Sequence, residues 1–259
     1  MNEQKQHLLK ALSKGIRYDG RKLTEFRPLK IEEDISKSAE GSARVTLGQT
    51  DLFVGVKMAV EKPYPDTQDK GNLMVNAELR PLSSPEFETG PPGMQAIELA
   101  RVVDRGIRES ESIDTKKLCI EVGEQVWSVM IDVCSVNDDG NLLDAAGLGA
   151  IAALKNTKFP KLEDGKINYE EKTNESLPLN KEPIPVTVYK IGDYLIVDPL
   201  PIEEKFMDAR LTVAVTQDGN ICAMQKGGSK QLSIEEIDTM VGIAIEKSNE
   251  LRKILGGKK

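Results

Sequence analysis

The sequence predicts an α+β protein made of two related lobes, in which strands precede a long helix. The evidence is that a predicted hairpin comes before a long helix in each half, at residues 142–155 and again at 233–255. With 259 residues, 39% of them hydrophobic, the chain can bury a sizeable core. The predicted boundaries are an N-terminal helix at 1–16, a first lobe at 17–156, a connection at 157–184 and a second lobe at 185–259.

The first lobe is predicted to follow a short helix and to consist mainly of strands. Residues 3–13 repeat leucines on one helical face and end near Gly15, and residues 17–28 form a polar loop. Two longer helices are expected at 94–109, after a Gly-Pro-Pro-Gly break, and at 142–155, where many Ala and Gly residues favour a buried position. The predicted strands are 42–47, 52–60, 73–79, 118–122 and 126–136.

The second lobe is predicted to follow a polar connection. Residues 159–183 are charged and have a weak apolar pattern, so no strand is predicted there. The final helix should begin at Ser233, where Glu236 three residues later completes a capping box. The predicted strands pair as 186–191 with 194–197, and as 211–215 with 221–225 around an Asp-Gly turn.

Composition restricts the function. The chain has 35 basic and 42 acidic residues, a net charge of -7, so any RNA-binding basic groups must be concentrated locally. The only histidine, His7, is expected at the surface, and Cys119, Cys134 and Cys222 are expected as buried free thiols. The sequence predicts no metal, no cofactor and no membrane span, and it favours a cytoplasmic location.

Several motifs resemble one family. The run Arg-Tyr-Asp-Gly-Arg at 17–21 by itself predicts salt links that pin the N-terminal loop to the body. Together with residues 41–45 and 48–50 it resembles the opening of the RNase PH family, and the resemblance continues in order to Leu255. Within that family the chain is most similar to the non-catalytic ring subunits of the archaeal exosome, through residues 80–82, 87–92, 97–105, 126–127, 132, 198–199 and 207–209.

This resemblance implies a fold and an assembly. The fold would be the RNase PH-like fold, which is ribosomal protein S5 domain 2-like. The chain would alternate with an active RNase PH-type exosome subunit in a hexameric ring of three heterodimers. The ring would carry RNA-binding cap subunits and degrade single-stranded RNA as a phosphorolytic 3′-to-5′ exoribonuclease.

The chain departs from the active members of that family at the phosphate site. Active relatives hold phosphate with a Ser/Thr-Arg or Ser-Arg-Arg step near the start of a long helix, because phosphate needs a fixed guanidinium with hydroxyl and backbone donors. Here residues 90–95 read Gly-Pro-Pro-Gly-Met-Gln, and the two prolines remove backbone donors. Thr89 is the only hydroxyl nearby. The sequence therefore predicts that the chain has no catalytic residue of its own.

The acidic residues of the second lobe also depart from the active pattern. Active relatives place two aspartates about six residues apart, and Asp208 resembles the second of them. Six residues earlier stands Ile202, although neighbouring glutamates could substitute. Two interpretations remain, a Mg²⁺ site or an acidic surface or interface salt-link set, and both use Asp198, Glu203, Glu204 and Asp208.

The helix at 94–109 carries the predicted RNA contact. Offsets of four and seven place Arg101, Arg105 and Arg108 along one ridge, which suits a polyanion backbone. The resemblance implies that this helix lines the RNA channel beside the active partner's site. The alternative is a solvated face whose partners are Glu98, Asp104 and Glu109.

The predicted function is thus a non-catalytic, RNA-contacting exosome ring subunit that supports a neighbour's active site. Two alternatives stay open. In one, the chain is an active phosphorolytic exoribonuclease that uses Asp208. In the other, it is a structural ring spacer that does not touch RNA.

Overall fold

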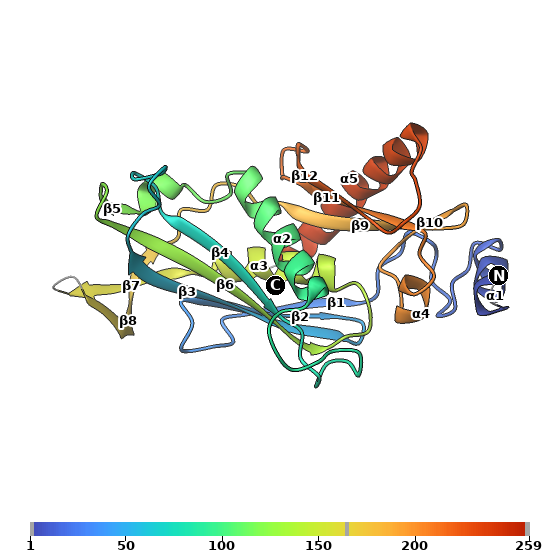
Figure 1. Cartoon of the computed structure of the whole chain (residues 1–259), viewed down its shortest axis with the longest axis horizontal. Helices are drawn as coiled ribbons and strands as arrows, with labels where there is room; N and C mark the ends of the chain where they lie inside the picture. The colour runs from blue at the N-terminus through green and yellow to red at the C-terminus, as the bar shows by residue number, and fades with distance from the viewer. Residues whose placement is uncertain (1–2, 164–165, 257–259) are drawn as a thin grey trace.

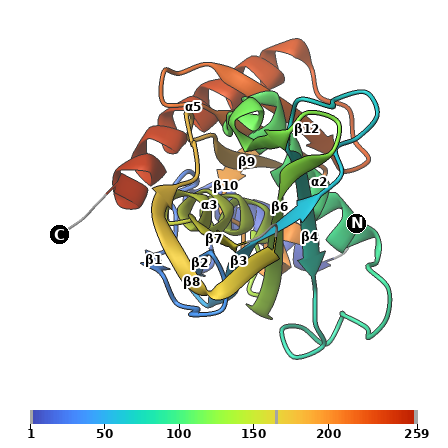
Figure 2. The same ribbon diagram turned by 90° about the vertical axis from the view of Figure 1, so that its left-hand side faces the viewer.

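Two β-sheets with helices between them organise the chain into four layers. The structure is a computed structural model that describes residues 3–163 and 166–256. The first sheet lies on one side of two helices, the second sheet lies on their other side, and the last helix covers the second sheet (Figures 1 and 2). This order of layers agrees with the α+β class and the strand-then-helix order predicted for each half.

The first sheet is built around two long antiparallel strands. Its members are β1 (Leu29–Glu33), β2 (Gly41–Leu47), β3 (Thr50–Glu61), β4 (Asn72–Glu78), β5 (Cys119–Glu121) and β6 (Gln125–Asn137). The strands run in the order β1-β2-β3-β6-β4, with β5 paired to the end of β6. All of the pairs are antiparallel except β4 with β6.

The central helix α3 (Leu142–Lys155) is buried between the sheets, as its Ala and Gly content predicted. It packs against β2 and β3 on one side and against a strand of the second sheet on the other. Gly147 and Gly149 permit this approach. A Cβ at Gly147 would lie 2.2 Å from Pro185, and one at Gly149 would lie 2.7 Å from Val54. Helix α2 (Met94–Glu109) packs beside α3, and a short 3-10 helix, η1 (Thr115–Leu118), follows it.

The second sheet is entirely antiparallel and is covered by the last helix. The elements of this half are β9 (Ile184–Ile191), β10 (Tyr194–Val197), α4 (Pro201–Glu204), β11 (Ala209–Val215), β12 (Ile221–Gly227) and α5 (Ile234–Gly256). The strand order is β10-β9-β11-β12, and α5 covers β9 and β11. The predicted capping box of α5 is confirmed, because the Ser233 amide donates to Glu236 and the Glu236 amide donates to Ser233.

The N-terminal helix α1 (Glu3–Leu12) lies at one end of the molecule beside α4 (Figure 1). Leu8 and Leu12 are its buried face and pack against a small apolar cluster that includes Tyr189 of β9. His7 is exposed, as predicted, and its ring stacks on Tyr18 with the centroids 5.8 Å apart.

The structure differs from the sequence prediction at several places. The connection contains a hairpin of β7 (Lys158–Glu163) and β8 (Lys166–Ser176), which lies at the end of the molecule opposite α1 (Figure 1). Most of its described side chains are charged or exposed, so no buried alternation marks it in the sequence. Strand β1 was missed because its Leu-Lys-Ile-Glu-Glu sequence buries little. The three cysteines are free but half-buried rather than buried.

Within the described residues, no helix is both long enough and apolar enough to span a membrane.

Candidate functional site

Arg17 of the N-terminal loop is buried against the second lobe. Its guanidinium forms an ion pair with Glu203, whose side chain is also fully buried. It also donates to the carbonyl oxygens of Val197 at 2.8 Å and Asp198 at 2.7 Å. The guanidinium therefore has acceptors for most of its N–H groups. This confirms that the Arg-Tyr-Asp-Gly-Arg segment pins the N-terminal loop to the body.

The carboxylate of Asp198 accepts hydrogen bonds from the other two arginines of the same loop. Arg27 donates to both of its carboxylate oxygens, at 2.6 Å and 2.9 Å, and Arg21 adds a bond of 2.8 Å. The side-chain amide of Asn141 donates to the same carboxylate at 3.1 Å. Burial by itself would lower the pKa of Arg27, but the hydrogen bonds and charge of Asp198 outweigh burial and raise it.

The remaining acidic residues do not gather into one exposed set. Glu204 is half-buried, and it accepts from the backbone amide of Asn141 at 2.9 Å and from the Tyr189 hydroxyl at 3.1 Å. Loss of solvent around its carboxylate raises its pKa. Asp208 lies apart, paired with Lys5 of α1 at 2.7 Å and with the Gly192 amide at 2.7 Å. Burial would raise the pKa of Asp208, but the bonds from Lys5 and the Gly192 amide outweigh it and lower this pKa.

The prediction of an acidic surface or interface set was therefore wrong for part of the set. Asp198 and Glu203 lie inside the protein with arginine partners from the same chain, because the N-terminal loop folds onto the second lobe. The described residues contain no group of three His, Cys, Asp or Glu side chains that could hold a metal. The carboxylates at this site act chemically as acceptors for arginine, amide and hydroxyl donors.

Asp144 in the first turn of α3 extends this network into the second sheet. The Asn141 amide donates to it at 3.0 Å and the Thr187 hydroxyl at 2.7 Å, and Thr187 in turn contacts Thr212 of β11 at 2.9 Å. Burial raises the pKa of Asp144 to about 8. The sequence analysis did not identify this residue. Its only signal is an acidic residue at the start of an otherwise apolar helix.

The arginine ridge of α2 is exposed, as predicted. The opposite face buries Leu99, Val103 and other apolar side chains of the helix. The three arginines differ in their partners. Arg108 pairs with Asp104 at 2.6 Å and also donates to the Leu73 carbonyl at 3.0 Å.

The other two ridge arginines have no carboxylate partner among the described residues. Arg105 donates to the side-chain oxygen of Gln225 on β12 at 3.0 Å. Arg101 makes no hydrogen bond or ion pair within the described chain. Glu98, one of the partners expected for a solvated face, pairs with Arg210 of β11 at 2.7 Å. The ridge thus presents two guanidinium groups that are open to an external anion.

The start of α2 lies close to the ridge in sequence and lacks a charged side-chain donor. Helix α2 begins after Gly93, which has no side-chain cap. Residues 89–95 are exposed, and apart from backbone amides only Thr89 and Gln95 could donate to an anion at this end. This agrees with the missing Ser, Thr and Arg at residues 90–95 in the sequence.

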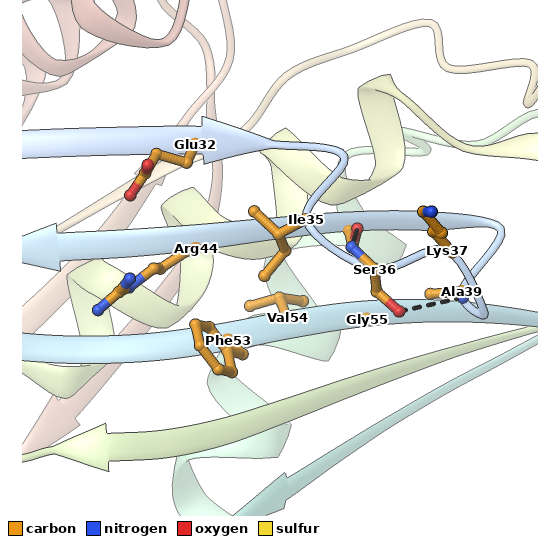
Figure 3. A pocket seen from close by; sticks show the side chains of 10 residues that line it. Glu32, Ile35, Ser36, Lys37, Ala39, Arg44, Phe53, Val54 and Gly55 are labelled. Carbon is orange, nitrogen blue, oxygen red and sulfur yellow. Dashed lines mark hydrogen bonds between the residues drawn. The ribbon is translucent and has the colours of Figure 1, made fainter.

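A groove of about 620 Å³ lies on the face of the first sheet opposite α3 (Figure 3). Ile35 and Phe53 contribute apolar surface to it, beside the loop that follows β1. Arg44 at its edge is held by both oxygens of Asp51, at 2.9 Å and 2.7 Å, and lies 5.4 Å from the centre of the Phe53 ring. The guanidinium is therefore already occupied. The sequence analysis did not single out this groove.

Comparison with known proteins assigns both lobes to one family. Residues 25–160 match the model described as 3′ exoribonuclease family, domain 1, and residues 181–247 match domain 2 of the same family. Among curated relatives, Exosome complex component Rrp42 of Methanopyrus kandleri is 48% identical over 248 residues, covering 95% of this chain and 93% of the relative. Exosome complex component Rrp42 of Thermococcus kodakarensis is 47% identical over 255 residues, covering 95% and 92%.

Solved structures show the same likeness. A chain of the Archaeoglobus fulgidus exosome with RNA bound to the active site superposes with a TM-score of 0.90 at 46% identity, covering 97% of both chains. A chain of an archaeal exosome core gives a TM-score of 0.87 at 42% identity, covering 98% of this chain and 97% of the other. Rice Rrp46 gives 0.69 at 18% identity, which is a likeness of fold alone.

Proposed function

Because this chain belongs to the 3′ exoribonuclease family of RNase PH type, we propose that it is a non-catalytic, RNA-contacting ring subunit of an archaeal exosome. It would alternate with an active RNase PH-type subunit in a hexamer, carry RNA-binding cap subunits, and guide single-stranded RNA to the neighbour's phosphorolytic site. We place this ring in the cytoplasm, as the sequence predicted.

The observation that carries the proposal is the pair of open guanidinium groups on α2. The chain has a net charge of -7, so exposed arginines without carboxylate partners are a local exception. Arg101 and Arg105 lie about one helical turn apart and can contact successive phosphates of an RNA strand. Arg108 is on the same ridge, but Asp104 neutralises it, so we expect it to contribute less. Such contacts would hold RNA of any sequence, because phosphates carry no base information.

The partners of the acidic residues favour the non-catalytic role over an active enzyme. Asp198 is saturated by Arg21, Arg27 and Asn141. Asp208 is committed to Lys5 and a backbone amide. The alternative of an active enzyme that uses Asp208 therefore has less support.

The test is RNA binding by the assembled ring. Replacing Arg101 and Arg105 by Glu should leave the ring intact, because the packed face of α2 is unchanged. RNA affinity and degradation should fall for all sequences, and the log–log salt slope should decrease by roughly 0.7 for each phosphate that is no longer bound. Titration with labelled oligoadenylate at several salt concentrations measures both quantities.

A matched control removes a purely electrostatic explanation. Lys14→Glu with Lys116→Glu changes the net charge by the same amount at exposed positions away from α2. This variant should bind RNA nearly as the wild type does. If the α2 variant also keeps wild-type affinity and slope in an intact ring, the chain is a structural spacer.

The same preparations test catalysis. The isolated chain, with RNA, phosphate and Mg²⁺, should release no nucleoside diphosphates, while its mixture with the active partner should release them. Release by the isolated chain that Asp208→Ala abolishes would establish the active-enzyme alternative instead.

A further inference from the structure

Arg101 has two acidic residues within one helical turn. Glu98 precedes it by three positions and Asp104 follows it by three, and acidic residues at this spacing ordinarily pair with an arginine on the same helix. In the structure neither of them pairs with Arg101. Asp104 pairs with Arg108 at 2.6 Å, and Glu98 pairs with Arg210 at 2.7 Å. Arg101 therefore lacks a carboxylate partner because both neighbouring carboxylates pair with other arginines.

Arg210 reaches Glu98 from another lobe of the protein. It stands on β11, 112 positions away in the sequence, and only 9% of the residue is exposed. Its guanidinium crosses directly over Gly227 of β12, where a Cβ would lie 1.6 Å from Nη1. Any side chain at position 227 would require this guanidinium to move. The glycine in β12 thus lets the Arg210 guanidinium cross the neighbouring strand and reach Glu98 of α2.

The energetics favour this pair over an intrahelical one. A nearly buried guanidinium without an anion is costly, whereas an exposed intrahelical pair contributes little. Glu98 is the only carboxylate that forms an ion pair with Arg210 among the described residues. Pairing with Arg210 is therefore the stronger option for Glu98, and Arg101 keeps its charge available.

We propose that Arg210 is a positioning residue for RNA: it draws Glu98 away from Arg101, so that the Arg101 guanidinium is free to bind a phosphate. This rests on the proposed function, in which Arg101 contacts RNA. Without Arg210, Glu98 would turn to Arg101, neutralise it, and place a negative charge beside the RNA backbone. Arg210 itself would not touch RNA, since it lies beneath α2.

A simpler role for the same ion pair is to tie α2 to the second sheet. The two roles predict different results when both partners are removed. If the pair is only a tie, either single change breaks it, so Glu98→Gln should weaken binding as Arg210→Met does, and removing both partners should not return binding to the wild-type level. If Arg210 keeps Glu98 from Arg101, removing Glu98 as well should restore RNA binding.

The experiment compares Arg210→Met, Glu98→Gln and the double variant in rings assembled with the active partner. Arg210→Met should weaken binding of labelled oligoadenylate by about fivefold, in the range expected when one solvent-exposed hydrogen bond or ion pair is lost. Glu98→Gln alone should bind as the wild type does. The double variant should return to within about twofold of it. If Arg210→Met does not fold, Arg210→Gln carries the same expectations.

A crystal structure of the isolated Arg210→Met chain gives a readout that needs no RNA. The Glu98 carboxylate should lie within about 4 Å of the Arg101 guanidinium, close enough for an ion pair. A double variant as weak as Arg210→Met, or a Glu98 carboxylate that stays away from Arg101, would overturn the inference. If Arg101→Met alone leaves RNA affinity unchanged, the proposed RNA contact fails, and the crystal structure still decides what Arg210 does.

Discussion

The arginines of the N-terminal loop and those of helix α2 have opposite surroundings. Arg17 and Arg27 are buried, and each donates to a carboxylate and to backbone carbonyl groups of the same chain. Arg101 and Arg105 are exposed and have no carboxylate partner among the described residues. The role of each arginine thus depends on whether the fold places a carboxylate beside it. A saturated guanidinium stabilises the fold, and an open one can bind a ligand.

The largest effect should come from removing the carboxylate that pairs with the buried arginines. Asp198→Ala removes the carboxylate shared by Arg21 and Arg27, and leaves the buried Arg27 with only the half-buried Asp139 as an anionic partner. We expect a loss of about 3–5 kcal/mol in the free energy of unfolding, measured by urea denaturation, because a buried charge that loses its main partner is costly.

The control for this prediction is a more exposed pair of the same kind. Asp51→Ala breaks the ion pair with Arg44, whose side chain is 41% exposed, and should cost about 1 kcal/mol or less. Equal losses for the two variants would show that burial does not separate the arginines as proposed.

A smaller effect per pH unit tests the network that continues from Asp198. The pKa of Asp144 is raised by burial to about 8, from its usual 3.8, so the folded protein holds a proton that the unfolded chain releases. The stability that this proton adds to the fold is fully present below the pKa of Asp144 in the unfolded chain. It is lost as pH rises through the pKa of Asp144 in the folded protein. The free energy of unfolding should therefore decrease between these values, by up to about 1.4 kcal/mol per pH unit.

Asp144→Asn provides the comparison, because the amide cannot titrate. Its urea denaturation curves should depend less on pH than those of the wild type across this window. RNA binding by folded, assembled rings should not change, since Asp144 is buried away from the open arginines. Parallel pH dependence in the two proteins would mean that Asp144 is ionised in the fold.

The smallest effect should separate two arginines on one ridge. Arg108→Met removes a guanidinium that Asp104 already neutralises, so RNA affinity of the ring should change by about twofold or less. Arg101→Met removes an open guanidinium and should cost about fivefold. Fluorescence titrations at one salt concentration distinguish the two. A larger loss of RNA affinity for Arg108→Met would show that Arg108 leaves Asp104 to bind the phosphate.

The spacing of residues in the sequence predicted those helices that depend on interactions between near neighbours in the chain. The buried stripe of α2 and its opposite arginines follow from helical spacing, and the α5 capping box follows from Ser233 and Glu236. The small residues of α3 predicted a buried helix, which the structure confirms, and Gly147 and Gly149 let it approach the elements on both sides. The β7–β8 hairpin could not be predicted in this way, because most of its side chains are charged or exposed and alternation marks a strand only where one face is buried.

Which charges pair was decided by the tertiary structure alone. The partner of Arg27 lies 171 positions away at Asp198, and the partner of Glu98 lies on another lobe at Arg210. Local spacing would have joined Glu98 to Arg101. An ion pair forms where burial makes an unpaired charge costly, and burial depends on how the lobes pack. Helical spacing was therefore enough to predict α2 and its ridge, and only the folded chain shows which arginines stay open.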